Sequence, residues 1–260
     1  MDLGIAGLTA LVTGASRGIG FAVARRFALE GCNVHLASRS APDLESARDK
    51  ILKESKVRVT CHALDLARGE SIDRLTAECG EVDILVNNAG AIPQGDLLAV
   101  DDKRWREAWE LKVFGYINLT RAIYAKMRDR KRGVIVNVIG TAGERPASIY
   151  IAGTAGNAAL MAFSRALGGE SVDYGVRVVG VNPGSTETER ARKRIEKLAE
   201  TKFGDASRWR ELTKDAPFGR LATSDELADV IVFMASARAS YVSGTVVTVD
   251  GGRTVRNRTA

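Results

Sequence analysis

Histidine and cysteine are scarce in this chain, which has two of the first and three of the second among 260 residues. Cys32, Cys61 and Cys79 are odd in number and stand in segments that read as helix or strand, which favours reduced thiols in a cytoplasmic protein. They lack the short paired spacing of a zinc site, and His35 and His62 fall in strand-like runs. We therefore expect no metal site and two buried strand histidines.

Long apolar runs and linkers are also absent. No stretch reaches the roughly 18 apolar residues that a membrane-spanning helix needs, and the segment 1–5 lacks the basic start of a signal peptide. No Pro- or Ser-rich linker, low-complexity tract or repeat divides the chain, and 45% of its residues are hydrophobic. We expect one domain over residues 1–260 and no membrane partner.

The chain is basic, with a net charge of +6 and clusters at 121–132, 190–197 and 253–258. Glutamates interrupt the second cluster at helical spacing, and no aromatic residues interleave as base-stacking platforms would. A basic surface explains this pattern, and we predict no nucleic-acid partner.

Strand-like apolar runs alternate with helix-like segments along the whole chain, beginning with a strand at 8–12 and a helix at 19–30. Alternation of this kind predicts a parallel sheet with helices on both faces. Further strands are predicted at 33–37, 57–63, 82–86, 133–138, 176–181 and 244–249, and helices at 42–54, 69–78, 101–130, 149–171, 188–213 and 224–235.

Three glycines, Gly14, Gly18 and Gly20, fall between the first strand and the first helix. A helix N-terminus offers unpaired N–H donors and the positive end of a dipole, and glycine lets the backbone approach a pyrophosphate. On this motif alone a tight turn without a ligand remains an alternative, because many strand-to-helix turns contain glycine.

The spacing Gly-x-x-x-Gly-x-Gly resembles that of the short-chain dehydrogenase/reductase family, and the resemblance runs from about Leu8 to Gly252. Asn87-Asn88-Ala89-Gly90, Tyr150, Asn182-Pro183-Gly184 and Asp250-Gly251-Gly252 occur in the family's order. The resemblance implies a single-domain Rossmann fold with a doubly wound, seven-stranded parallel sheet. It also implies cofactor contacts at Gly14, Ser16, Arg17, Gly18, Ile19, Gly20, Asp65, Leu66, Asn88, Ala89, Gly90, Thr154, Pro183, Gly184, Thr186 and Thr188.

The residues at the end of the second strand bear on which nicotinamide cofactor binds. An NAD site usually has an acidic residue there, which would repel a 2′-phosphate. Here Ser38 and Arg39 stand at this place, and Arg17 adds a second cation. A guanidinium can bind a phosphate with two hydrogen bonds, so we predict NADP(H) rather than NAD(H). The alternative is that both arginines are solvated surface charges.

The resemblance implies that Tyr150 is the general acid or base and that Thr141 takes the place of the family's serine. The family's lysine, four residues after the tyrosine, is Thr154 here, and Lys112 occupies the position of the family's asparagine. A nearby cation lowers the pKa of a tyrosine, which is near 10 when free. Our hypothesis is that Lys112 supplies this charge and that Thr154 keeps a contact to ribose or water.

Two functions follow. The first is an NADP(H)-dependent oxidoreductase that interconverts a secondary alcohol and a ketone, with a small carbonyl or alcohol compound as substrate. The second is a catalytically impaired NADP(H)-binding sensor or scaffold, in which Lys112 is an ordinary helix residue. The polar segment at about 185–218 is expected to form a lid over the substrate. The resemblance further implies a homotetramer or homodimer packed through the helices at 101–130 and 148–171.

Overall fold

The computed structural model describes residues 1–256, so the last four residues of the expected domain lie outside it. Its strands are β1 (Thr9–Thr13), β2 (Asn33–Ser38), β3 (Val59–Ala63), β4 (Ile84–Asn87), β5 (Gly133–Val138), β6 (Val176–Pro183) and β7 (Val246–Val249). All pair in parallel in one sheet, in the order β3-β2-β1-β4-β5-β6-β7. The predicted doubly wound, seven-stranded α/β fold is confirmed.

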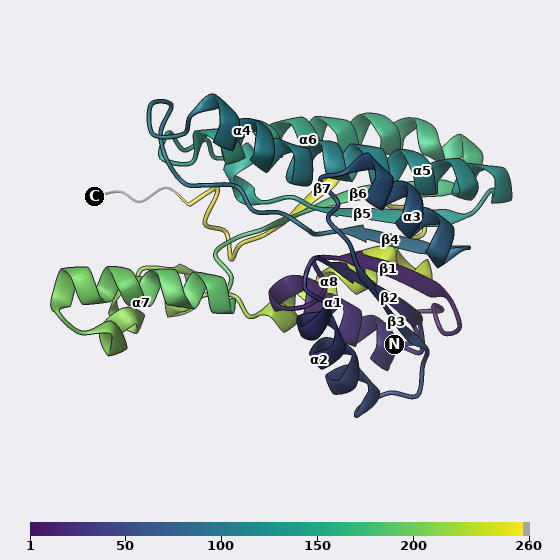
Figure 1. The fold of residues 1–260 in the computed structure, drawn as a ribbon, viewed down its shortest axis with the longest axis horizontal. Helices are drawn as coiled ribbons and strands as arrows, with labels where there is room; N and C mark the ends of the chain where they lie inside the picture. Colours follow the sequence, from purple (N-terminus) through teal and green to yellow (C-terminus); the bar gives the residue numbers. More distant parts are fainter. Residues whose placement is uncertain (257–260) are drawn as a thin grey trace.

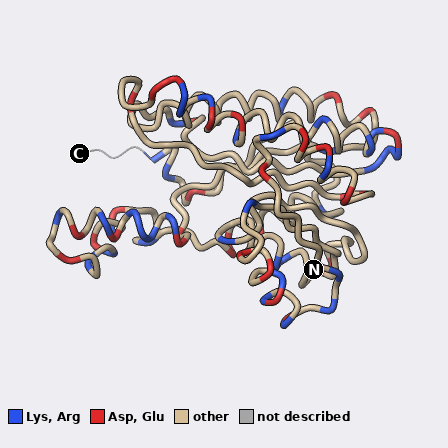
Figure 2. Tube along the Cα trace, viewed as in Figure 1, with Lys and Arg blue, Asp and Glu red and all other residues tan. Residues whose placement is uncertain are grey.

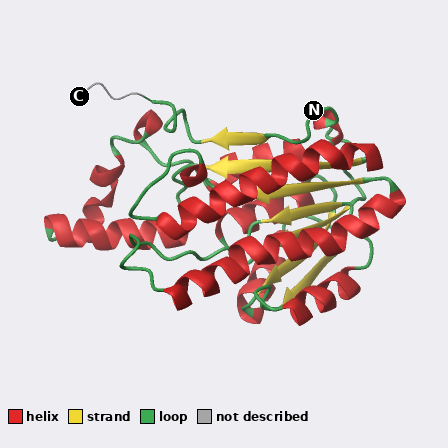
Figure 3. Ribbon diagram, turned by 90° about the horizontal axis from the view of Figure 1, so that it is seen from above, coloured by secondary structure: helices red, strands yellow, loops and turns green. Residues whose placement is uncertain are grey.

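Helices cover both faces of this sheet (Figure 1). One face carries α1 (Gly18–Leu29), α2 (Ala41–Leu52) and α8 (Ser224–Ala235), and the other carries α3 (Gly69–Cys79), α4 (Asp102–Trp109), α5 (Gly115–Arg130) and α6 (Ile151–Glu170). Seen from above, the helices run along the strands, which are visible between them (Figure 3). Short 3-10 helices lie at Thr141–Gly143, Ser171–Tyr174, Ala206–Thr213, Pro217–Gly219 and Ala237–Ala239.

Successive residues of β1 show why its run is apolar throughout. Val12 packs with Phe27 of α1 and Ile231 of α8, whereas the preceding Leu11 packs with Leu75 of α3 and Ile123 of α5. Adjacent side chains of a strand point to opposite faces, so a sheet covered on both sides needs an apolar residue at every position.

The strand order reverses between β1 and β4, which are paired through Ala10–Ile84 and Val12–Val86. In open parallel sheets the loops at the carboxyl ends of the two strands separate at such a point and leave a crevice for a ligand. This edge therefore positions the candidate site.

The predicted helix at 101–130 is interrupted by a π-helical segment, Glu110–Phe114, between α4 and α5. A π-helical turn inserts one residue and shifts which side chains face inward. It leaves Lys112 buried, with 8% of its surface exposed. Apolar periodicity cannot reveal one inserted residue, so the prediction of a single helix missed the break.

The predicted helix at 188–213 is also divided. Helix α7 (Glu189–Phe203) ends at Gly204, which has a φ of +69°, and the 3-10 helix Ala206–Thr213 folds back on it through the buried Trp209. This pair extends away from the sheet (Figure 1), and acidic and basic residues alternate along it (Figure 2). None of the helices within residues 1–256 has the length and apolar character required to span a bilayer.

Candidate active site

The glycine turn links β1 to α1 at the point where the strand order reverses. The backbone N–H groups of Gly14 and Ala15 donate to the Ala37 carbonyl of β2, at 2.7 and 3.3 Å. Arg17 is the N-cap of α1, and its side chain makes no capping hydrogen bond. The first N–H groups of α1 are therefore available to an anion.

The turn has no room for side chains. A Cβ on Gly20 would overlap the Gly14 carbonyl oxygen and lie 2.5 Å from Asn88 Nδ2, and one on Gly18 would lie 3.3 Å from the Thr188 methyl group. Asn88 Nδ2 donates to the Thr13 carbonyl at 3.0 Å. The structure thus brings together the predicted cofactor residues of the glycine turn, of the segment after β4 and of the start of α7.

The buried Thr13 hydroxyl holds this junction. It accepts hydrogen bonds from the N–H groups of Asn88 and Ala89, at 2.9 and 3.0 Å, and donates to the Val86 carbonyl at 3.4 Å. Our sequence analysis missed Thr13, although its place at the end of a strand beside the glycine turn was a usable signal.

The end of β2 and the glycine turn offer polar side chains that have no partner within residues 1–256. Among these residues the buried Ser38 Oγ makes no hydrogen bond. The Arg17 and Arg39 side chains are exposed and make no hydrogen bond or ion pair there. Because burying an unpaired hydroxyl costs free energy, Ser38 is poised to receive a ligand atom. One hydroxyl and two uncommitted guanidinium groups fit a 2′-phosphate.

Other predicted cofactor residues line the same edge. Asp65 and Leu66 follow β3; the Asp65 carboxylate accepts from Ala67 N–H at 3.2 Å, and the Leu66 carbonyl lies beside the start of α5. Ser16 and Ile19 belong to the glycine turn.

The chain leaving β6 connects this edge to α7. Gly184 N–H donates to the Val249 carbonyl at 2.9 Å, and the buried Thr186 hydroxyl donates to the Gly184 carbonyl at 3.2 Å. Thr188 caps α7 by accepting from Ala191 N–H at 3.2 Å. Pro183 ends β6. These contacts hold the expected cofactor segment in one conformation.

Tyr150 is the N-cap of α6, and its backbone is tied to the loop after β4. It forms a parallel bridge with Gly95, whose N–H donates to the Ile149 carbonyl at 2.8 Å and whose carbonyl accepts from Ile151 N–H at 3.3 Å. A Cβ on Gly153 would overlap the Tyr150 ring, so the ring lies directly across this glycine. The tyrosine is thus held by two elements.

The Tyr150 hydroxyl makes no hydrogen bond within residues 1–256. Burial raises the pKa of Tyr150, while the positive charges of Arg190 and Arg194 on α7 act in the opposite direction. The cations that act on Tyr150 therefore come from the start of α7. Our sequence analysis interpreted the basic cluster at 190–197, which contains these arginines, as a charged surface.

Lys112 binds a different tyrosine. Its Nζ donates to the Tyr116 hydroxyl at 2.9 Å and to the Val138 carbonyl at 2.7 Å, and the Tyr116 hydroxyl donates to the same carbonyl at 2.9 Å. Burial, together with the nearby charge of Arg190, lowers the pKa of Lys112 to about 7. Burial, and then the neighbouring Tyr150, raise the pKa of Tyr116. Tyr116, four residues after Lys112 on one helix face, was missed.

Gly90 is where several of these groups meet. A Cβ there would lie 2.6 Å from the Lys112 Cδ, so the lysine side chain passes over the glycine. The Gly90 carbonyl accepts from Arg190 Nη1 at 3.3 Å. The end of the Asn88-Ala89-Gly90 segment therefore contacts two basic side chains of the site, Lys112 and Arg190.

The Thr154 hydroxyl, for which we expect a contact to ribose or water, bonds to the loop before Tyr150. It accepts from Ala147 N–H at 3.2 Å and donates to the Ala147 carbonyl at 3.3 Å. Both bonds fasten the loop before Tyr150 to α6, so here Thr154 shapes the loop.

Thr141 begins the short 3-10 helix after β5, and within residues 1–256 no hydrogen bond joins its hydroxyl to Tyr150. The neighbouring Gly140, with a φ of +134°, is held by two buried asparagines. Its N–H donates to Asn182 Oδ1 at 3.2 Å, and its carbonyl accepts from Asn157 Nδ2 at 3.3 Å. These asparagines fix the turn that presents Thr141, and the supporting role of Asn157 was missed.

Comparisons with known proteins agree with this geometry. The family model described as short chain dehydrogenase matches residues 8–199. The chain is 30% identical to 2,3-dihydro-2,3-dihydroxybenzoate dehydrogenase of Bacillus subtilis (97% of this chain, 98% of that protein). It is 36% identical to galactitol 2-dehydrogenase (L-tagatose-forming) of Cereibacter sphaeroides (96% of each).

Among solved structures, L-sorbose reductase of Gluconobacter frateurii, complexed with NADPH and L-sorbose, superposes with a TM-score of 0.94 at 34% identity. The match covers 99% of this chain and 100% of the reductase chain. The sequence resemblance is thereby confirmed over almost the whole length. This chain belongs to the short-chain dehydrogenase/reductase family of oxidoreductases.

Proposed function

We propose that the protein is an NADP(H)-dependent oxidoreductase that interconverts a secondary alcohol and a ketone. The observation that carries the proposal is the Tyr150 hydroxyl, which has no hydrogen-bond partner within residues 1–256 and is held rigidly at the sheet edge that also bears the glycine turn. A positioned acid with a free hydroxyl can protonate a reacting oxygen. Two similar proteins carry names of polyol and ketose oxidoreductases, which supports this substrate class.

The cofactor fits the glycine turn and the end of β2. The free N–H groups of α1 would bind the pyrophosphate, and Ser38, Arg39 and Arg17 would bind the 2′-phosphate. When bound, NADPH supplies the hydride that reduces the carbonyl carbon. The NADPH complex of the similar L-sorbose reductase supports NADP(H) over NAD(H).

In this proposal Tyr150 donates its proton to the carbonyl oxygen during reduction and accepts it during oxidation. Burial keeps the hydroxyl protonated near neutral pH, and the positive charges of Arg190 and Arg194 act against burial to make it a stronger acid. Lys112 is proposed to act through Tyr116, its hydrogen-bond partner and the electrostatic neighbour of Tyr150. We retain Thr141 as the group that orients the carbonyl.

One observation favours the second candidate, an NADP(H)-binding sensor or scaffold. Within residues 1–256 the Lys112 amine donates to Tyr116 and Val138 and the Thr154 hydroxyl bonds to Ala147, and neither group is hydrogen-bonded to the Tyr150 hydroxyl. The two candidates differ in turnover and share cofactor binding.

A panel of ketoses, cyclic ketones and polyols, followed by NADPH absorbance, tests the proposal. We expect at least one substrate class to turn over, and Tyr150→Phe to lose activity while it keeps NADPH affinity in a fluorescence titration. Tight NADPH binding without turnover anywhere in the panel would establish the sensor. Equal affinities for NADPH and NADH would refute the cofactor assignment.

The oligomeric state of the protein and its cellular compartment stay predictions. We propose a homodimer or homotetramer that packs through the α5 and α6 region, in the cytoplasm. Size-exclusion chromatography with light scattering measures the assembly, and a monomeric mass would contradict it.

A further inference from the structure

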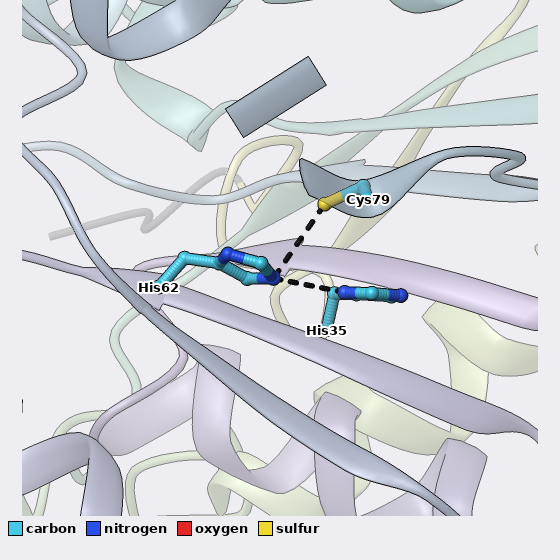
Figure 4. A group of neighbouring side chains, drawn as sticks. All are labelled: His35, His62 and Cys79. Atoms are coloured by element: carbon cyan, nitrogen blue, oxygen red, sulfur yellow. Dashed lines mark hydrogen bonds between the residues drawn. The ribbon is translucent and has the colours of Figure 1, made fainter. Parts of the chain in front are cut away.

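Two histidines and a cysteine meet on the α3 side of the sheet, among residues that the proposed reaction does not use (Figure 4). His35 lies on β2, His62 on β3, and Cys79 is the last residue of α3. One ligand atom from each lies within 4.8 Å of the other two. The sheet register creates this cluster: Ala37 pairs with His62, so His35, two residues earlier on the same face, is its diagonal neighbour.

The distances between these atoms are close to those of a metal site. His62 Nε2 lies 2.8 Å from His35 Nδ1 and 3.7 Å from Cys79 Sγ (Figure 4). Zinc binds nitrogen at about 2.0–2.1 Å and sulfur at about 2.3 Å, so its tetrahedral ligand atoms lie roughly 3.3–3.6 Å apart. Shifts of about 1 Å or less in side-chain position would complete such a site.

The second nitrogen of His62 is oriented as in known metal sites. His62 Nδ1 lies 2.8 Å from Glu78 Oε2, and the other oxygen of this carboxylate accepts from Arg74 Nε at 2.6 Å. A carboxylate that accepts the Nδ1 proton fixes the histidine tautomer and leaves the Nε2 lone pair for a metal. In His62 this lone pair faces both His35 and Cys79.

The surroundings hold the cluster and leave it reachable. His62 and Cys79 are buried, and Cys79 packs with Ile72 and Leu75 of α3. His35 is half-buried, so one side of the cluster adjoins solvent. Two strands and a helix end supply the groups, which limits how far they can separate.

We propose that His35 Nδ1, His62 Nε2 and Cys79 Sγ bind one zinc ion, with water as the fourth ligand. Two imidazoles and a thiolate suit a borderline metal such as zinc better than magnesium or calcium, which prefer oxygen. The ion fastens α3 to β2 and β3. This site reverses the expectation from sequence spacing, which could not show the pairing of the two strands.

Proton balance sets one consequence of the proposal. Without metal, His62 donates its Nδ1 proton to Glu78, so its Nε2 accepts from His35 Nδ1 and from the Cys79 thiol. On zinc binding, the thiol proton leaves to solvent and His35 moves its proton from Nδ1 to Nε2. One proton is therefore released per ion.

The direct test is metal analysis of the full chain after removal of any affinity tag. After incubation with zinc chloride and desalting, we expect elemental mass spectrometry to find about one zinc ion per chain. Replacement by cobalt should give thiolate-to-cobalt charge-transfer absorption in the near ultraviolet. Less than about one tenth of an ion per chain, or a cobalt spectrum without that absorption, would overturn the proposal.

Variants identify the ligands. Cys79→Ser and His62→Gln should lose the metal and the cobalt absorption, whereas Cys61→Ser should keep both. Cys61 is the matched control, because it is the neighbour of His62 on β3 and its thiol donates to the Leu44 carbonyl at 3.4 Å instead. Unchanged zinc content in folded Cys79→Ser would refute the site.

A measurement on the unaltered protein covers the case in which a variant fails to fold. Iodoacetamide labelling followed by peptide mass spectrometry should show Cys79 protected at least about ten-fold by zinc chloride, with the rate at Cys61 unchanged. Equal labelling of Cys79 with and without zinc would refute the metal site and leave three side chains that are joined by hydrogen bonds alone.

Discussion

The Lys112 amine and the Tyr116 hydroxyl, four residues apart along the chain, both donate to the Val138 carbonyl oxygen at the end of β5. Burial disfavours the charged form of an amine whose partners within residues 1–256 are neutral groups, and with the nearby charge of Arg190 it lowers the pKa of Lys112 to about 7. The first two predictions follow from this arrangement.

The stability of the protein should depend on pH through Lys112. The folded pKa of about 7 lies below the value of 10.5 for a free lysine, so the unfolded chain binds more protons between these two pH values. The free energy of unfolding should rise with pH across this window, by at most about 1.4 kcal/mol per pH unit from this group. Urea unfolding at pH 7, 8 and about 9 measures it. Lys112→Met should lack this part of the slope; identical slopes in both proteins would exclude a depressed pKa.

Lys112→Met should also impair turnover. We propose that the Lys112 amine acts on Tyr150 through the Tyr116 hydroxyl. Without the amine this influence is lost, so we expect kcat to fall about 100-fold and the pH optimum to rise. Lys126→Met is the control, because Lys126 lies on α5 and binds the Thr76 carbonyl on another part of the surface. Initial rates between pH 6 and about 9 make the comparison. If Lys112→Met and Lys126→Met behave alike, Lys112 has no part in the reaction.

Because Gly153 lies close to the Tyr150 ring, substitutions at Gly153 and at Gly169 should have different effects on turnover and on the stability of the protein. Gly153→Ala would push the ring away from its position, and kcat should fall at least about ten-fold. Gly169→Ala, in the same helix and facing open space, should leave kcat unchanged and stabilise the protein by roughly 0.5–1 kcal/mol. Thermal unfolding and steady-state rates of both variants are needed. Full activity in Gly153→Ala would show that the ring position is not important for turnover.

Removing the guanidinium of Arg39 should change the cofactor preference. A charge-assisted bond to a phosphate contributes about 1.5–3 kcal/mol, so Arg39→Ala should weaken NADPH binding about ten-fold or more and leave NADH affinity nearly unchanged. Fluorescence titration of each cofactor gives both values, and NADH serves as the internal control. A parallel loss for both cofactors would place Arg39 away from the 2′-phosphate.

The fold was predictable because its signals are local. The apolar run that became β5 and the helix-like segment that became α8 needed no long-range information. The predicted strand at 133–138 and helix at 224–235 match Gly133–Val138 and Ser224–Ala235. The π-helical segment at Glu110–Phe114 was not predictable in this way, because it inserts one residue into an otherwise helical pattern.

The site was predictable only in part, for a physical reason. The glycine turn lies within one strand-to-helix connection, and the structure places Asn88 and Thr188, two of the expected cofactor residues, beside it. The partners of Lys112 depend on how α5 faces β5, and those of Thr154 on the path of an irregular loop. The Lys112–Tyr116 pair follows a four-residue helical spacing that was open to sequence analysis, whereas the contacts with Val138 and Ala147 depend on how the elements pack.

The hydrogen bond from Arg190 to the Gly90 carbonyl keeps the start of α7 close to Tyr150 and Lys112. The pKa values of these two groups therefore depend on where α7 lies. Arg190 lowers the pKa of both Tyr150 and Lys112, and it belongs to the first turn of a helix that extends away from the sheet (Figure 1). Withdrawal of that turn would strengthen the hold of both groups on their protons, and its return would loosen it. If α7 serves as the lid that the sequence predicts, its closure over the substrate would increase the acidity of both groups.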